Sequence, residues 1–96
     1  MHAVVRTYSG TGAKQLFDIL HERKADVEAA LSKVPGLVSY TLARSGDGGV
    51  SVTVCNDKKG TDESLRVAKE WISKNAASTS AGAPIVSEGT VITHIK

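Results

Sequence analysis

The run GLVSYTLARSGDGGVSVTVCNDKKGTDESLRVAKEWI, residues 36–72, decides the fold. β-Branched, aromatic and aliphatic side chains fill residues 37–44 and favour a strand. The glycines of SGDGG, residues 45–49, allow positive φ angles, so we expect a hairpin loop of about five residues here. Residues 50–55 alternate valine with a small side chain, which is the period of a second strand with two unlike faces.

The two faces of this hairpin differ in chemistry. If Arg44 lies opposite Val50, one face is apolar and packs against helices, and a one-residue slip would mix the faces. That face would hold Val38, Tyr40, Leu42, Val50, Val52 and Val54. The bare face would hold Ser39, Thr41, Ala43, Ser51, Thr53 and Cys55, together with Arg6 and Tyr8 if the first strand points them the same way.

Helix signals stand on both sides of the hairpin. Thr61 is a suitable N-cap followed by two carboxylates that favour the helix dipole, so a helix is expected from this residue onward. An apolar stripe at helical spacing predicts another helix over residues 13–33, which a Pro-Gly pair ends. Because Lys24 interrupts that stripe, we expect a kink or fraying within residues 22–26.

Two further strands complete the pattern. Residues 2–9 alternate and predict a first strand, and residues 90–95 are the clearest part of the last strand, with Gly89 as a bulge or bend. Small side chains at residues 76–83 predict an exposed, mobile loop, either a lid or a linker.

The order βαββαβ predicts one α+β domain, residues 1–96, with a ferredoxin-like four-stranded antiparallel sheet and two helices on one face. A second copy covering the bare face would close a barrel around a small, partly polar space.

Composition excludes several classes of protein. With 41% hydrophobic and 23% charged residues, the 96-residue chain has ordinary globular composition. No apolar run approaches the roughly 20 residues of a membrane helix, and no signal peptide is recognisable. The twelve basic residues are spread among ten acidic ones, and aromatics make up 4%, so no nucleic-acid partner is expected. A lone cysteine excludes an internal disulfide and suits the reducing cytoplasm.

From the first strand to the last, the chain resembles small uncharacterised bacterial proteins of the dimeric α+β barrel superfamily, the one that contains antibiotic-biosynthesis monooxygenases. Residues 35–72 carry the resemblance. It implies the barrel fold and a homodimer, but not one reaction, because the superfamily holds cofactor-free oxygenases, haem-degrading enzymes and proteins without known activity. Haem-degrading members are expected to use an Asn on the first strand, a Trp and a later His. Only Trp71 matches here, since position 81 is alanine and the first strand has no asparagine.

Five residues are the candidate ligand-binding set: Arg6, Tyr8, Thr53, Trp71 and His94. Arg6 carries the strongest argument, because a cation within a central strand requires a carboxylate or an anionic ligand. Asp47 and Glu88 are its possible protein partners. The alternative for His94 is a strand histidine near the surface or at the dimer edge, and the alternative for Trp71 is core packing.

No metal site and no cofactor are expected, because no two histidines have a chelating spacing. Cys55 could be a nucleophile or a redox sensor if a nearby cation lowered its pKa, and a small buried sheet residue is the favoured interpretation.

Two functional hypotheses remain. In the first, the chain binds or oxidises a small aromatic or anionic molecule in the barrel cavity, using the electrons of the substrate and no bound metal. In the second, it is a non-catalytic dimer with a structural or stress-related role, whose interior is filled by its own side chains. The second predicts no pocket of several hundred cubic ångströms, the size of ordinary ligand sites. Whether the chain is an enzyme is left open by the sequence.

Overall fold

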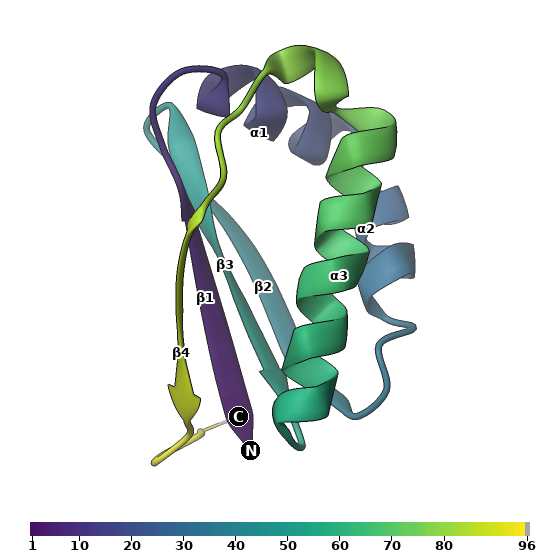
Figure 1. The fold of residues 1–96 in the computed structure, drawn as a ribbon, viewed down its shortest axis with the longest axis vertical. Helices are drawn as coiled ribbons and strands as arrows, with labels where there is room; N and C mark the ends of the chain where they lie inside the picture. Colours follow the sequence, from purple (N-terminus) through teal and green to yellow (C-terminus); the bar gives the residue numbers. More distant parts are fainter. Residues whose placement is uncertain (96) are drawn as a thin grey trace.

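A computed structural model describes residues 1–95 of the chain. The strands are β1 (His2–Tyr8), β2 (Leu37–Ser45), β3 (Gly48–Cys55) and β4 (Ile85–Thr90), and the helices are α1 (Ala13–Glu22), α2 (Lys24–Leu31), α3 (Lys58–Asn75) and the short 3-10 helix η1 (Ala77–Thr79). The strands form one antiparallel sheet in the order β2-β3-β1-β4, and the helices cover one of its faces (Figure 1). The predicted α+β ferredoxin-like arrangement is confirmed.

The first helical stretch is divided in two. It was expected to be one helix over residues 13–33, but α1 ends at Glu22 and α2 begins at Lys24. Arg23 between them leaves the helical region, with φ −106° and ψ 30°. The expected break is therefore confirmed, and it lets the two short helices follow the twisted sheet at different angles.

The hairpin turn is tighter than predicted. Ser45 pairs with Gly48, so only Gly46 and Asp47 form the turn, and Gly46 supplies a positive φ of 57°. Arg44 lies opposite Gly49, not opposite Val50 as the symmetric five-residue loop required. The predicted register is therefore wrong by one residue on β3.

This shift reverses the expected faces of β3. Ser51, Thr53 and Cys55 face the helices and are fully buried, so the valines between them point to the uncovered side. The reason is the close approach of α3, whose buried residues are all small: Gly60, Thr61, Ser64 and Ala68. A Cβ built on Gly60 would lie 2.6 Å from the Cβ of Cys55, so valine side chains have no room beneath this helix.

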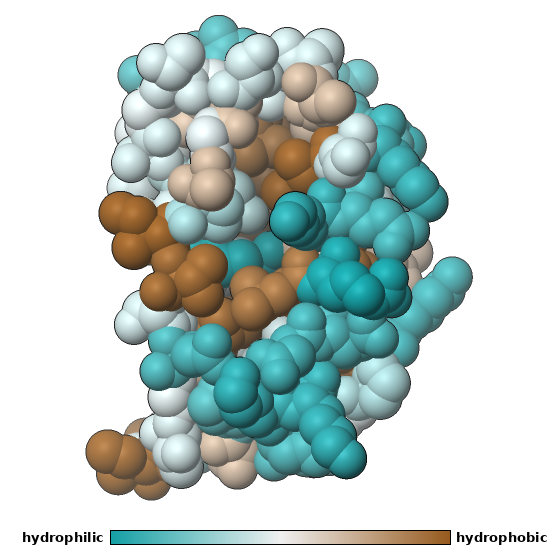
Figure 2. Space-filling view, in the orientation of Figure 1, coloured by the Kyte–Doolittle hydropathy of each residue, from teal (hydrophilic) through white to brown (hydrophobic). Residues whose placement is uncertain are grey.

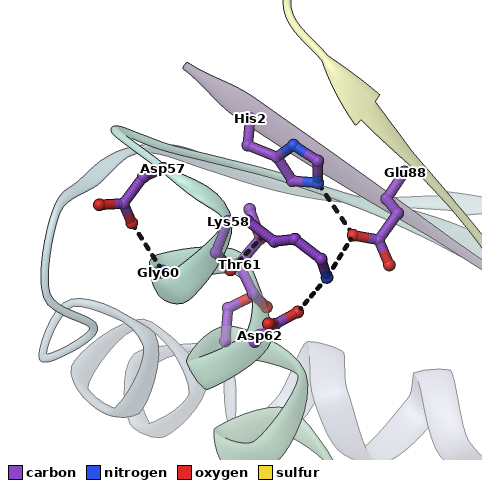
Figure 3. Close-up of polar contacts among 8 residues, drawn as sticks. His2, Asp57, Lys58, Gly60, Thr61, Asp62 and Glu88 are labelled. Atoms are coloured by element: carbon purple, nitrogen blue, oxygen red, sulfur yellow. Dashed lines mark hydrogen bonds and ion pairs between the residues drawn. The ribbon is translucent and has the colours of Figure 1, made fainter.

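The N-cap of α3 lies four residues earlier than predicted. Asp57 is its N-cap, and the carboxylate accepts a hydrogen bond from the Gly60 backbone N–H at 3.1 Å (Figure 3). Thr61, the predicted cap, is buried in the first turn and donates its hydroxyl hydrogen to the Lys58 carbonyl at 3.0 Å. Aspartate and threonine are both favourable N-cap residues. The helix begins after Asp57, close to the end of β3 at Cys55.

The last strand also lies earlier than predicted, at Ile85–Thr90 and not at residues 90–95. β4 pairs with β1 from Thr7↔Ile85 to His2↔Thr90, and the pairing stops where β1 itself begins. Gly89 is a regular paired residue opposite Ala3, without the predicted bulge. Beyond the strand, Val91 donates its N–H to the Met1 carbonyl at 3.0 Å.

The segment at residues 76–83 is only partly the exposed loop that was predicted. Ala76 is buried, and Ala81 packs against the hydrophobic core. Gly12, at the N-terminus of α1, lies so close to Thr79 and Ala81 that a Cβ would overlap their backbone atoms. The segment is therefore docked on α1 by close contacts.

Polar contacts fasten β4 to its neighbours (Figure 3). Glu88 accepts a hydrogen bond from His2 Nε2 at 2.9 Å and pairs with Lys58 Nζ at 3.2 Å, and Lys58 also binds Asp62 at 2.9 Å. One carboxylate thus connects β4 to β1 and to the start of α3. The hydrogen bond from His2, followed by that from Lys58, lowers the pKa of Glu88 below its usual value.

The contacts of Glu88 with His2 and Lys58 make the attachment of β4 dependent on pH. Because the pKa of Glu88 is lower in the folded chain, its contribution is complete above the ordinary glutamate pKa and is lost as the pH falls through the lowered value. We therefore expect the β4 amides to exchange hydrogen faster, relative to those of β3, once the pH is taken below about 4. In Glu88→Gln that extra acid sensitivity should disappear. An equal acid response in both proteins would contradict the role of this carboxylate.

Candidate functional site

Arg6 is the most unusual side chain of the fold. It lies on β1, points toward the helices and is 3% exposed. Its Nε has no hydrogen-bond partner, and no carboxylate within residues 1–95 forms an ion pair with it. Neither suggested protein partner reaches it, since Glu88 binds His2 and Lys58, and Asp47 is exposed in the turn. A buried charge without a countercharge costs several kcal/mol, so the burial of Arg6 is unfavourable for its charged group.

Two tyrosines line the same space as Arg6. Burial raises the pKa of Tyr8 and of Tyr40, and attraction by the Arg6 guanidinium together with hydrogen bonding to it opposes that rise only in part. Both hydroxyls are therefore neutral at neutral pH and supply no countercharge. Tyr8 also packs edge-on against Phe17, with ring centroids 5.8 Å apart, which ties the site to the hydrophobic core.

These side chains surround a small space of about 20 Å³, which we call the Arg6 cavity. Such a volume holds about one water-sized group. Its lining residues are Arg6, Tyr8, Leu20, Val27, Leu31, Tyr40, Leu42, Ser51, Ala68, Trp71 and Ile72. Arg6 and Ser51 are paired across β1 and β3, and the Ser51 hydroxyl also lacks a hydrogen-bond partner within the described residues.

A larger groove adjoins this cavity. It lies between β2 and the α1–α2 pair, has a volume of about 660 Å³, and is called here the β2 groove. Its walls share Leu20, Val27, Leu31, Tyr40 and Leu42 with the Arg6 cavity. Polar side chains lie at its rim, namely His21, Lys24, Glu28, Ser32, Ser39 and Arg44. Because β2 is an edge strand, the groove opens to solvent along the side of the sheet.

Another face of the molecule shows the same layering. In Figure 2, apolar side chains gather in the hollow between the sheet and α3, and hydrophilic side chains of α3 border that hollow. Within residues 1–95, the layer between the sheet and the helices is mainly apolar, and Arg6 is its one buried cation.

Trp71 forms one wall of the Arg6 cavity, and its other side borders a groove of about 450 Å³ between α2 and α3. Arg23, at the break between α1 and α2, lies over its ring with the guanidinium carbon 5.5 Å from the centroid. Arg23 also donates to Asn75 Oδ1 at 2.7 Å, and Asn75 Nδ2 donates to the Trp71 carbonyl at 2.9 Å. The break in the helix therefore places a cation that holds the indole in position.

Of the predicted ligand-binding residues, Arg6, Tyr8 and Trp71 line one cavity. Thr53 lies next to Ser51 on the same face of β3, fully buried, and its hydroxyl likewise has no partner among the described residues. His94 follows β4 outside any strand and does not line the cavity or the β2 groove. Arg6 and Tyr8 do not share the bare sheet face with the serines and threonines of β2, because β1 turns them toward the helices.

Sequence reasoning missed the β2 groove and Ser51. Leu20, Val27 and Leu31 were assigned to an ordinary core stripe, but these residues also line the groove beside β2. Ser51 was placed on the uncovered face. The available signal was the glycine pair at residues 48–49, which can extend a strand as easily as it can form a loop.

Cys55 is the buried sheet residue that was favoured. Its thiol is fully buried, and burial, followed by repulsion from Asp57, raises its pKa, so the thiolate is disfavoured at neutral pH. Within residues 1–95 no group of three or more His, Cys, Asp or Glu side chains gathers as a metal site would require. No helix of this region has the length and apolar character needed to cross a membrane.

Comparisons with known proteins give the fold a context. No family model and no curated protein sequence matches the chain. Among solved structures, the monooxygenase of the gene ActVA-Orf6 from Streptomyces coelicolor, determined with nanaomycin D, has a TM-score of 0.70 at 19% identity, with 99% of this chain and 90% of that chain covered. SnoaB, a cofactor-independent oxygenase from Streptomyces nogalater, has a TM-score of 0.66 at 20% identity, with 98% and 95% covered. The chain has the fold of the antibiotic-biosynthesis monooxygenases.

A third match is a dimeric ferredoxin-like protein from an uncultured marine organism, with a TM-score of 0.65 at 13% identity and with 99% of this chain and 95% of that chain covered. Proteins similar to this chain therefore include dimers. At these identities the likeness concerns the fold, and the resemblance stated from the sequence is confirmed at that level.

Proposed function

We propose that the chain binds a small aromatic or anionic molecule in the β2 groove and oxidises it without a metal or an organic cofactor. The observation that carries this proposal is Arg6, a buried cation without a protein countercharge among the described residues, in a small cavity that adjoins an apolar groove. Electrons would come from the ligand itself and pass to dioxygen. The fold shared with a cofactor-independent oxygenase supports this assignment.

The proposed site lies on the helix side of the sheet. From the sequence it was placed on the opposite side, in a barrel cavity between two sheets, because the valine face was expected to lie under the helices. The register of β3 moves Ser51 and Thr53 to the helix side, where they join Arg6 and Tyr8. One chain therefore supplies every residue of the site proposed here.

The competing hypothesis was a non-catalytic dimer with a filled interior. It predicted that no pocket would be large enough for a ligand. The β2 groove, at about 660 Å³, falls within the range of ordinary ligand sites and weighs against that hypothesis.

We also propose that two copies associate through the uncovered face of the sheet, in a cytoplasmic protein with no nucleic-acid partner. Val5, Val50 and Val52 face this side, and Ile85 on the same face is 72% exposed. A dimer would remove such apolar surface from water. The dimeric protein with this fold supports the proposal. Native mass spectrometry should give twice the mass of 10.1 kDa, and a monomer at micromolar concentration would contradict it.

Binding in the groove can be tested by calorimetric titration with 4-nitrophenol and 4-nitrobenzoate. We expect saturable binding of both, with amide chemical shifts that change in β2 and α2. Arg6→Ala should weaken the binding at least about tenfold, because it removes the charge in the cavity that adjoins the groove. The matched control is Arg66→Ala, which removes an exposed cation of α3 that pairs with Glu70 at 2.9 Å and lines neither the cavity nor the groove. Unchanged affinity in Arg6→Ala would contradict the role of Arg6, and no binding by the unaltered protein would contradict the function.

A further inference from the structure

The Arg6 cavity contains polar atoms that the protein does not satisfy. Arg6 Nε and Ser51 Oγ have no hydrogen-bond partner within residues 1–95, although Arg6 is 3% exposed and Ser51 is 1% exposed. The two residues are directly paired across β1 and β3, so their side chains leave the sheet on the same side and next to each other. Buried donors without partners are rare in native folds. We therefore expect a bound group to accept hydrogen bonds from these two atoms.

The size of the cavity limits that occupant. About 20 Å³ holds a group as large as one oxygen atom with its hydrogens, and it cannot hold an aromatic ring. A ring can lie in the adjoining β2 groove, whose inner wall of Leu20, Val27, Leu31, Tyr40 and Leu42 is shared with the cavity. Together the two spaces fit a flat apolar body that carries one terminal oxygen.

The charge of the cavity determines whether that oxygen is bound as a neutral group or as an anion. Arg6 is the only charged side chain among the residues lining it, and Tyr8 and Tyr40 face it as neutral hydroxyls. Water would satisfy the hydrogen bonds but would leave the positive charge uncompensated. An anionic oxygen satisfies both, and it gains most in a site where the protein excludes solvent.

We propose that the Arg6 cavity is an oxyanion site, in which Arg6 Nε and Ser51 Oγ donate hydrogen bonds to the single charged oxygen of a phenol or enol bound in the β2 groove. The ligand loses its hydroxyl proton to the solvent on binding and stays bound as the anion. This inference rests on the proposed groove binding and adds the protonation state of the ligand and the role of Ser51.

The ultraviolet–visible spectrum of 4-nitrophenol tests the inference, because its anion has a separate visible band. In a buffer about one pH unit below the pKa of the free ligand, about one tenth of it is ionised. Excess protein should raise the bound fraction in the anionic form to about half or more, which corresponds to a pKa lowered by at least about one unit. The methyl ether 4-nitroanisole has no proton to lose and should bind at least about tenfold more weakly.

Variants separate the oxyanion site from the groove. Arg6→Met should abolish the gain in the visible band, and Ser51→Ala should reduce it. Arg66→Met, at an exposed position of α3 that lines neither the cavity nor the β2 groove, should leave it unchanged. Binding of 4-nitrophenol with the spectrum of its acid would overturn the oxyanion site and leave groove binding in place. A full anion band in Arg6→Met would overturn it as well. If neither ligand binds the unaltered protein, the proposed function itself fails.

Discussion

Replacing Arg6 with methionine should raise the free energy of unfolding by about 1–4 kcal/mol. The arginine is 3% exposed and forms no ion pair within the described chain, so folding removes its charge from water without a countercharge. Methionine is unbranched and fills irregular apolar space, and the residues around position 6 include Leu20, Leu42 and Ile72. The same change should abolish the binding of anionic ligands, because the charge that attracts them is gone.

Urea denaturation of Arg6→Met and of the unaltered protein measures the first effect. Arg44→Met is a suitable control, because Arg44 is partly exposed and its pair with Asp18 lies at the surface, where ion pairs contribute at most about 1 kcal/mol. A less stable Arg6→Met would mean that the guanidinium is a structural element of the core. A more stable variant that no longer binds anions is the behaviour of a functional site that the fold maintains at a cost in stability.

Gly49→Ala should destabilise the fold by about 3 kcal/mol or more. A Cβ at this position would overlap the Phe17 ring and the backbone carbonyl oxygen of Ala43, and neither can move freely. Phe17 is 2% exposed in the hydrophobic core, and the Ala43 carbonyl belongs to the neighbouring strand β2. The expected loss therefore comes from forced movement of both the core and the sheet.

Gly82→Ala provides the matched control. Nothing lies within 4 Å of a Cβ built there, and the position has no positive φ, so the change should be neutral or slightly stabilising through the unfolded chain. Thermal and urea unfolding of the two variants should differ clearly. If Gly49→Ala is as stable as Gly82→Ala, residues 48–49 form a loop as the sequence suggested, and the register that buries Ser51 is wrong.

The sequence was informative wherever local chemistry decides local structure. The alternation at residues 50–55 identified a strand, the interruption at Lys24 identified a break between helices, and the order of elements identified the ferredoxin-like sheet. These features depend on propensity and on the spacing of apolar residues, both of which can be read along one segment. Arg6 could also be singled out, because a cation in a central strand demands an explanation in any fold.

The sequence by itself thus determined the elements, their order and the residue types available for a site. The tertiary structure alone decided which face of β3 is buried, where β4 ends and which residues share a cavity. A hairpin register differs by one residue between two turn lengths that the same glycines allow, and the choice depends on Phe17 and on the small face of α3, which are distant in sequence. Because one step of register moves every side chain to the other side of the sheet, these distant contacts placed Ser51 beside Arg6 and created the candidate site.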